Sequence, residues 1–280
     1  MRPVDSALVL QRCNDSQGVV YYHSPLLDGI GVPHAFTTRI GGVSRAPYES
    51  LNLGNPSGLS PDQHDSADHI AENYRRLHHA IGCESRLRCF VHQVHGGDVL
   101  RVAPDRGFAN GDCADALITS DSTKLLAIRV ADCAPVLVAT EDGHTVAAIH
   151  AGWRGVVANV VSNTIKAMDA PSDRLFAAIG PCIGFDAFEV GTEVVEAFTQ
   201  RFGSAAPVRA HSSVADKAYV DLRAAVRVQL VQAGVSADRI EMTDRCTYRD
   251  ADEFFSHRRD RGITGRMAAV VGPRAAGSFG

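Results

Sequence analysis

The sequence predicts an α/β (α+β) protein whose mixed β-sheets are covered by helices, and not a Rossmann fold. Apolar, β-branched runs typical of strands outnumber the amphipathic runs typical of helices, and the two kinds do not alternate regularly, as parallel βαβ units would require. No repeat of fixed period and no low-complexity linker divides the 280 residues. We therefore expect one domain over residues 1–280.

Runs of apolar and β-branched residues that end at Gly, Pro or polar turn residues predict the strands. In chain order these are residues 19–22, 32–38, 87–94, 98–102, 115–119, 125–130, 134–140, 145–149, 175–179, 188–190, 239–242 and 267–271. The third and fourth strands are expected to turn back on each other at the tip His95-Gly96-Gly97. Glu141-Asp142-Gly143 joins the seventh and eighth strands as a β-hairpin.

Periodic apolar positions predict the helices, and capping residues predict where they begin and end. The helices are expected at 61–80, 156–168, 192–202 and about 219–233. Pro61-Asp62 is a start signal, while Gly82 and Gly234 are stop signals after the first and last helix. The polar segment 204–215 is expected to be a surface loop, and 273–280 a flexible tail.

Composition disfavours several classes of protein. The formal net charge is −4, so the chain has no basic surface that would favour nucleic acid. The apolar patch at 7–10 is broken by Gln11 and Arg12, which makes it too short for a signal peptide, and no run approaches the roughly 18 apolar residues of a membrane helix. The seven cysteines, an odd number without a Cys-x-x-Cys pair, indicate a reducing cytoplasm.

A hairpin brings its outer ends together, and a reactive side chain lies at each end of the central one. Cys133 precedes the strand 134–140 and His150 follows 145–149, so the two side chains are expected to meet. His95, beside two glycines where another group can approach closely, is a third candidate. Two imidazoles and a thiolate with an open fourth position are typical of a catalytic zinc site. The same atoms could also work without metal, with Cys133 as nucleophile and one His as general base.

A glycine-rich segment after the strand 32–38 is a candidate anion site. Adjacent glycines let backbone N–H groups turn toward one small anion, and a guanidinium fits phosphate. On residue types, Arg39, Gly42 and Ser44 could bind phosphate, or they could form an ordinary glycine turn with a solvated Arg. The histidines of the first expected helix, His64, His69, His78 and His79, are interpreted as its solvated face, and Cys113 and Cys182 as buried small residues.

Several blocks of sequence together resemble one known family. They are His-Ala-Phe-Thr-Thr-Arg-Ile-Gly-Gly-Val-Ser at 34–44, Ser-Leu-Asn-Leu-Gly at 50–54, Gln-Val-His-Gly at 93–96, Ala-Asp-Cys-Ala-Pro-Val at 131–136, His-Ala-Gly-Trp-Arg-Gly at 150–155, Ile-Gly-Pro-Cys-Ile-Gly at 179–184, Phe-Phe-Ser-His-Arg-Arg-Asp at 254–260 and Thr-Gly-Arg-Met-Ala at 264–268. As an ordered set they resemble the YfiH-like, laccase-domain family of purine nucleoside phosphorylases, formerly labelled polyphenol oxidases. The resemblance covers about residues 30–272.

The resemblance implies a four-layer α/β/β/α sandwich similar to the cysteine-hydrolase-like superfamily. It implies that His95, Cys133 and His150 hold a metal ion, zinc or copper. The implied activities are phosphorolysis of adenosine, inosine and S-methyl-5′-thioadenosine, with phosphate as co-substrate, and deamination of adenosine. Some relatives are instead linked to editing of peptidoglycan precursors. The implied partners are small molecules, with no nucleic acid or membrane, and the protein would be a monomer or a small homo-oligomer.

On this interpretation, phosphate held by Arg39, Gly42 and Ser44 attacks C1′ of the ribose. Asp132 is a candidate for the proton transfer that deamination needs, and Arg154 and Arg258 are further candidate contacts for phosphate or sugar. The chain departs from the family where His257 replaces a usual Tyr and Arg261 a usual Gly, so the wall of the pocket is expected to differ.

Two other functions compete with this one. A multicopper oxidase needs a blue site and a trinuclear cluster, and the sequence has no His-x-His pair from which to build them, although a single copper in the same site suits the ligands. A purine or metabolite sensor is the non-enzymatic alternative, which the open metal position disfavours.

Overall fold

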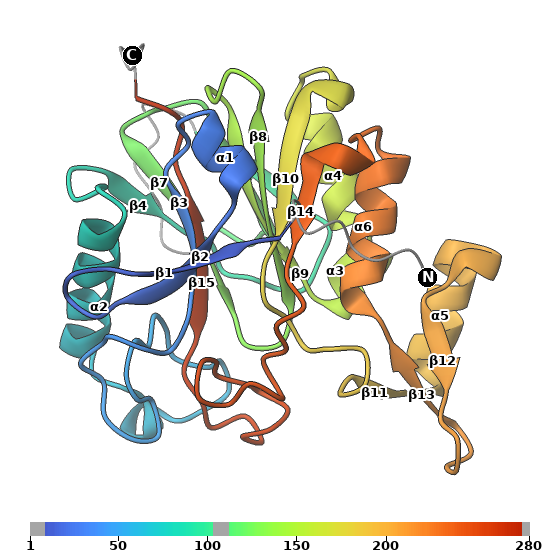
Figure 1. Ribbon diagram of the computed structural model, residues 1–280. Coiled ribbons are helices and arrows are strands. Elements are labelled where there is room, and N and C mark those ends of the chain that lie inside the picture. The colour runs from blue at the N-terminus through green and yellow to red at the C-terminus, as the bar shows by residue number, and fades with distance from the viewer. Residues whose placement is uncertain (1–8, 103–111, 276–280) are drawn as a thin grey trace.

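Two six-stranded sheets stack face to face in the computed structural model, which describes residues 9–102 and 112–275 (Figure 1). The first sheet has the order β1 (Gln11–Asn14), β2 (Val20–His23), β3 (His34–Thr37), β15 (Met267–Val271), β7 (Lys124–Val130) and β4 (Leu87–Cys89). The second has the order β14 (Ile240–Met242), β10 (Leu175–Ile179), β8 (Ala134–Thr140), β9 (Val146–Ala151), β6 (Ala116–Thr119) and β5 (Val99–Arg101). Each sheet contains parallel and antiparallel pairs, so both are mixed, as predicted.

Helices cover the two outer faces of this pair of sheets (Figure 1). The first sheet is covered by α2 (Ala67–Ala80). The second sheet is covered by α3 (Trp153–Val157), α4 (Val160–Ala167) and α6 (Leu222–Gln232), beside which α5 (Thr192–Phe202) packs. The predicted four-layer α/β/β/α order is therefore confirmed, while the likeness to cysteine hydrolases stays a prediction. None of the helices within the described ranges has the length and apolar character needed to cross a lipid bilayer.

The central strands carry nearly continuous apolar runs because both of their faces are buried. On β7, Leu126 and Ile128 point into the core between the sheets, while Leu125 and Ala127 point toward α2. A strand with one solvated face would instead alternate apolar and polar residues. The apolar hairpin at the centre of the sequence thus becomes the middle of the second sheet, and its ends are held rigidly.

The expected hairpin of 87–94 with 98–102 is wrong. The strand β4 pairs in parallel with β7 in the first sheet, and β5 pairs in parallel with β6 in the second. The intervening residues therefore cross from one sheet to the other, and His95 lies on this crossing. Asp115 accepts the backbone N–H groups of the crossing, and these groups cannot then form a hairpin ladder.

Two expected helices begin or end differently in the structure. The segment expected as a helix from residue 61 contains a short 3₁₀ turn at Pro61–Gln63, and α2 begins only after Ser66, whose hydroxyl accepts the N–H of Asp68. The helix expected at 156–168 is divided into α3 and α4, because Asn159 has a φ of 64°. Other 3₁₀ turns lie at Ser172–Arg174, Gly203–Ala205 and Ala237–Arg239.

The segment around the last helix also differs. The expected loop 204–215 contains β12 (Val208–Ala210), which pairs with β13 (Lys217–Val220) and, through it, with β11 (Glu189–Gly191) in a small third sheet. The helix expected from 219 begins after this strand, where the Asp221 side chain accepts the N–H of Ala224.

Sequence reasoning missed β1 and the short helix α1 (Pro25–Gly29). It placed β10, α5 and β15 correctly. Most of the expected tail, residues 276–280, lies outside the described residues.

Candidate active site

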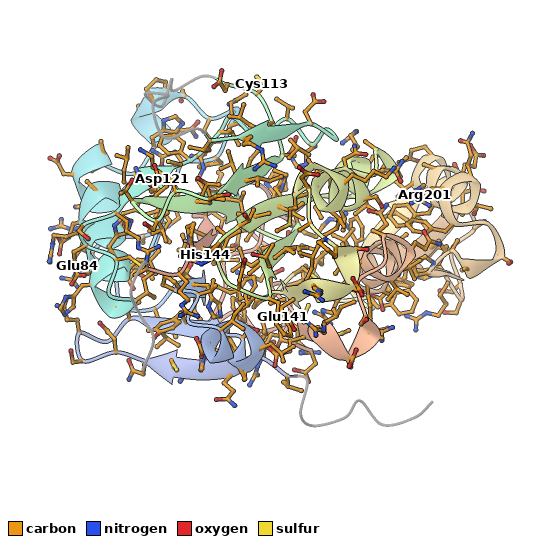
Figure 2. All side chains as sticks on the ribbon, turned by 90° about the horizontal axis from the view of Figure 1, so that it is seen from above. Glu84, Cys113, Asp121, Glu141, His144 and Arg201 are labelled. Atoms are coloured by element: carbon orange, nitrogen blue, oxygen red, sulfur yellow. The ribbon has the colours of Figure 1, made fainter. Side chains whose placement is uncertain are left out.

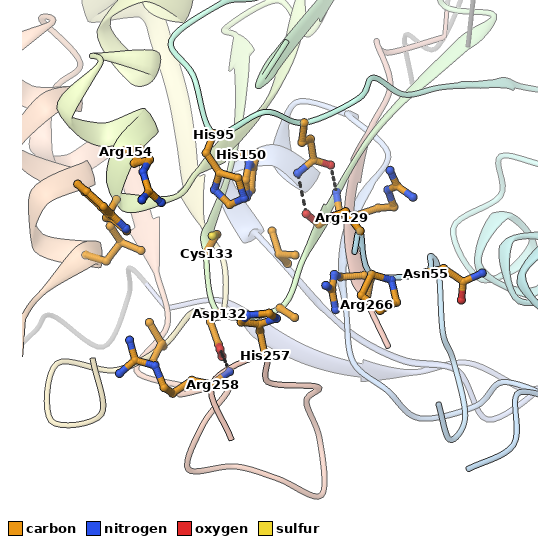
Figure 3. Close-up of a pocket in the computed structure, with 18 of the residues that line it drawn as sticks. Asn55, His95, Arg129, Asp132, Cys133, His150, Arg154, His257, Arg258 and Arg266 are labelled. Atoms are coloured by element: carbon orange, nitrogen blue, oxygen red, sulfur yellow. Dashed lines mark hydrogen bonds between the residues drawn. The ribbon is translucent and has the colours of Figure 1, made fainter. Parts of the chain in front are cut away.

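The predicted meeting of Cys133 and His150 is present in the structure. Pro135 pairs with His150, and Ala134 with Ala151, so the residue before β8 lies beside the end of β9. The crossing segment brings His95 to the same place, where its ring centroid lies 4.8 Å from that of His150. One ligand atom from each of these three side chains lies within 4.8 Å of the others (Figure 3). Three residues far apart in the sequence thus share one small volume.

Gly152 leaves the room that this cluster occupies. A Cβ atom on residue 152 would lie 2.7 Å from His95 Nδ1 and 3.0 Å from Cys133 Sγ. We expect Gly152→Ala to weaken metal binding because the added methyl group must push two of the three candidate ligands apart. Metal titration of the purified variant measures this effect. Gly29→Ala is the matched control, since a Cβ there meets nothing within 4 Å, and equal metal affinity of both variants would contradict the expectation.

Asp115 is the positioning residue that sequence reasoning missed. Its buried carboxylate accepts from His150 Nδ1 at 2.7 Å, and from the backbone N–H groups of His95 at 2.9 Å and Gly96 at 2.6 Å. The bond to Nδ1 leaves Nε2 of His150 as the possible metal ligand. The same carboxylate therefore orients one imidazole and holds the loop of the other. In the sequence, Asp115 is only an acidic residue at the start of an apolar strand. The sequence does not show that this strand pairs with the one that carries His150.

Cys133 and His150 change each other's pKa. Burial would raise the pKa of the Cys133 thiol, but the charge of His150 and hydrogen bonds from both imidazoles outweigh it and lower this pKa to about 6. Burial would likewise disfavour charged His150, but the Cys133 thiolate and Asp115 outweigh it and raise the pKa to about 9. At neutral pH the sulfur is therefore the thiolate that metals bind.

The donor set fits a metal ion. A thiolate and two imidazoles suit zinc or copper, and Asp115 supplies the outer hydrogen bond that metal-binding imidazoles usually make. Three protein ligands leave one coordination position for substrate or water. Among the described residues, no other group of His, Cys, Asp and Glu is arranged in this way.

The cluster lies on the wall of a cavity of about 630 Å³. This volume is within the range that small-molecule sites occupy. One part of the wall is apolar and comprises Trp153, Ile183, Phe188 and Leu222. Four guanidinium groups also line the cavity, those of Arg129, Arg154, Arg258 and Arg266. The cavity thus combines an apolar surface with excess positive charge, which suits an aromatic ligand and an anion.

The predicted contacts Arg154 and Arg258 are in this cavity, whereas Arg39 is not. The Arg39 side chain donates to the carbonyl oxygens of Glu49, at 2.6 Å, and Ala251, at 3.2 Å. Its guanidinium also lies 4.7 Å from the centre of the Phe255 ring. These contacts hold together segments far apart in the chain, and they leave Arg39 without access to the cavity.

The other residues of the predicted phosphate segment also make contacts within the chain. The backbone N–H of Gly42 donates to Ser50 Oγ, and a Cβ at residue 42 would clash with the Ser50 carbonyl. The Ser44 hydroxyl is buried and accepts from Asn73. Gly42 is therefore needed for the close approach of two chain segments, and its role in binding an anion stays a prediction.

Asp132 lines the cavity, but both of its oxygens already accept hydrogen bonds. Thr247 Oγ1 donates to Oδ1 at 2.6 Å, and the backbone N–H of Arg258 donates to Oδ2 at 2.7 Å. Asp132 thus holds the 258 segment against the cluster, and its use as an acid–base group is disfavoured. The wall residue His257, expected to alter the pocket, does line the cavity beside Asp132 (Figure 3).

Other predicted residues are placed as follows. Cys182 is buried, as expected, but Cys113 is exposed at the periphery of the molecule (Figure 2). His64 lies before α2 and lines the cavity, so it does not belong to a solvated helix face. On the helix itself, His69 pairs with Asp65.

Comparisons with known proteins agree with this geometry. Residues 33–274 match a family described as multi-copper polyphenol oxidoreductase laccase. The purine nucleoside phosphorylase YfiH of Escherichia coli (strain K12) is 40% identical over 241 residues, which cover 86% of this chain and 93% of that protein. The purine nucleoside phosphorylase YlmD of Geobacillus stearothermophilus is 34% identical over 87% of this chain and 91% of its own length.

The fold is also found among solved structures. The crystal structure of YlmD from Geobacillus stearothermophilus superposes with a TM-score of 0.83 and 31% sequence identity, covering 94% of this chain and 99% of that one. The Neisseria meningitidis protein NMB0706 superposes with a TM-score of 0.77 and 36% identity, covering 88% of this chain and 95% of that one.

Proposed function

We infer the function of this chain from the family to which it belongs, described as multi-copper polyphenol oxidoreductase laccase. Its curated relatives are named purine nucleoside phosphorylase, so a nucleoside-handling enzyme is the class supported. We propose that it is a metal-dependent enzyme that cleaves purine nucleosides with phosphate, releasing the free base and ribose 1-phosphate. One observation carries the proposal: the ligand atoms of His95, Cys133 and His150 meet on the wall of a cavity with an apolar and a cationic part.

The residues of the cavity fit the two substrates. Trp153 and Phe188 offer aromatic surface to a purine ring, and the arginines favour a phosphate dianion. In the reaction a phosphate oxygen forms a bond to C1′, the bond from C1′ to the purine nitrogen breaks, and the purine gains a proton. A metal ion held by His95, Cys133 and His150 would supply a Lewis acid that stabilises developing negative charge. The N–H group of the wall residue His257 is a candidate donor to the departing base.

The lining of the cavity supports a broad range of purine nucleoside substrates. Asp132 is the carboxylate among the described residues that line the cavity, and both of its oxygens are already bonded. A wall without an available carboxylate distinguishes poorly between the ring edges of adenine and hypoxanthine. We therefore propose adenosine, inosine and S-methyl-5′-thioadenosine as substrates, and deamination of adenosine as a second activity of the same site. The odd number of cysteines, without a Cys-x-x-Cys pair, supports a reducing compartment, the cytoplasm.

A second candidate function has one observation in its favour. Cys133, His150 and Asp115 form a chain of thiolate, imidazole and carboxylate, with 2.7 Å between His150 and Asp115. This is the arrangement of a cysteine hydrolase, in which the thiolate attacks an amide and the imidazole protonates the leaving amine. Editing of peptidoglycan precursors would use such chemistry, and it requires no metal.

Removal of the metal separates the two functions. We expect protein stripped by a chelator, and shown by elemental analysis to be metal-free, to produce no ribose 1-phosphate from adenosine and phosphate. Addition of zinc or copper, in separate samples, should restore the product and identify the metal that supports turnover. Phosphorolysis by the metal-free protein would contradict the proposal. Hydrolysis of a peptidoglycan amide by that same protein would favour the thiol mechanism instead.

A further inference from the structure

We propose that Arg129 and Arg266 together form the phosphate subsite of this cavity, supported by the segment 52–54. This inference deepens the proposed function and rests on it, because it assigns the place of the co-substrate. It also replaces Arg39, which sequence reasoning chose and which the structure places elsewhere.

The two arginines come from neighbouring strands and point to the same face. Arg129 lies near the end of β7 and pairs with Ala268 of β15. Arg266 lies two positions before Ala268, so its side chain leaves the sheet on the side of Arg129, as its diagonal neighbour. Both side chains line the cavity, and Figure 3 shows them on the same side of the metal cluster, beside Asn55.

Neither guanidinium pairs with a carboxylate in the part of the chain that the structure describes. Among the described residues, no ion pair includes Arg129 or Arg266, and the Arg266 guanidinium donates to the carbonyl oxygens of Thr264 and Gly265. Asp132, on the same cavity, is bonded to Thr247 and to the Arg258 backbone. Burial and the charge of Arg129 both lower the pKa of Arg266. The charges of Cys133 and Asp132 act in the opposite direction on the pKa of Arg266 but do not outweigh these two effects. Two adjacent positive charges repel each other, and a bound dianion would remove this repulsion.

The segment 52–54 holds this unfavourable pair in place. Asn52, fully buried, accepts the backbone N–H of Arg266 at 2.9 Å, and the N–H of Leu53 donates to the Arg266 carbonyl at 2.9 Å. Gly54 makes room for the other arginine, since a Cβ there would lie 2.6 Å from Arg129 Cδ. The Ser-Leu-Asn-Leu-Gly block thus has a role that the metal cluster does not explain.

The remaining two cavity arginines face a different environment. Arg154 lies 4.4 Å from the centre of the Trp153 ring, while Arg258 donates to the Glu189 carbonyl and lies 5.6 Å from the Phe188 ring. Figure 3 shows Arg154 and Arg258 across the metal cluster from Arg129. The base would lie on this aromatic side, and phosphate on the other, with the reacting ribose carbon between them.

The test compares Arg129→Gln, Arg266→Gln and their lysine counterparts with Arg39→Gln. Calorimetric titration with inorganic phosphate and the KM for phosphate are the two readouts. Loss of one charge-assisted contact is expected to weaken phosphate binding about 10-fold or more in each glutamine variant, with partial recovery in the lysine variants. Arg39→Gln should retain the wild-type affinity for phosphate. Wild-type affinity in both glutamine variants, or an equal loss in Arg39→Gln, would overturn the assignment.

Two outcomes separate this inference from the proposed function. If the wild-type protein forms ribose 1-phosphate but neither glutamine variant raises the KM for phosphate, the subsite is wrong and the function stands. If the wild-type protein binds phosphate through these arginines but forms no ribose 1-phosphate, the function is wrong and the subsite stands.

Titration with adenosine 5′-monophosphate tests the other source of a phosphoryl group: binding of this nucleotide without binding of inorganic phosphate would also overturn the proposal. Variants that do not fold, judged by circular dichroism, are replaced by Gly54→Ala, which displaces Arg129 without removing a charge and should likewise weaken phosphate binding.

Discussion

Cys133→Ala is expected to abolish stoichiometric metal binding and to lower kcat/KM for adenosine phosphorolysis by more than about 100-fold, because loss of an outer-shell partner alone typically costs 10- to 100-fold. Cys133 supplies the one thiolate of the candidate metal site, and its low pKa keeps the sulfur ionised at neutral pH. Without it, the two imidazoles form an incomplete site. Elemental analysis and the phosphorolysis assay measure the two effects.

Cys182→Ala provides the matched control for this change. Cys182 is also buried and close to the second sheet, but it is not in the cluster, and burial raises its pKa to about 11. This variant should bind metal as the wild type does. A Cys133→Ala protein that retains one equivalent of metal would show that the ligand assignment is wrong.

Asp115→Asn is expected to lower both the metal affinity, by about 10- to 100-fold, and the thermal stability of the fold. The carboxylate accepts from His150 Nδ1 and from the backbone N–H groups of Val94, His95 and Gly96. The amide of Asn has an NH₂ group in place of one carboxylate oxygen, and this group cannot accept a hydrogen bond. Some of the buried N–H groups therefore lose their acceptor, which lowers the free energy of unfolding by about 1–3 kcal/mol for each group. The loop that carries His95 and the ring of His150 should both lose their fixed orientation.

Asp142→Asn is the control for this second change. Asp142 lies at the opposite end of the hairpin β8–β9, and among the described residues its side chain accepts from the neighbouring Thr140 hydroxyl and His144 N–H. The Asp142→Asn substitution should lower the free energy of unfolding by about 1 kcal/mol or less and leave the metal affinity unchanged. Thermal unfolding and metal titration of both variants check the prediction. Unchanged metal affinity in Asp115→Asn would show that Asp115 does not position the cluster.

The success and failure of the sequence predictions have a common physical cause. Cys133 and His150 could be placed together because a tight turn sets the register of a hairpin within a few residues. His95 could be selected by residue type, but the expected hairpin around it was wrong, because β4 and β5 belong to different sheets. The Arg39 segment had the composition of an anion site, yet its donors were used by Ser50 and by distant carbonyl groups.

Two features of the fold could be predicted from the amino-acid sequence alone: the mixed α/β class, and the central hairpin with a thiol and an imidazole at its ends. These features depend on the period of apolar residues and on turns, which act over short distances along the chain. The three-dimensional packing was needed to show that Asp115 orients the ring of His150 and holds the backbone of His95, and that Arg129 and Arg266 line the cavity while Arg39 does not. The reason is that a buried donor or charge takes its partner from whichever segment the packing of the sheets brings near it, and no local pattern records that choice.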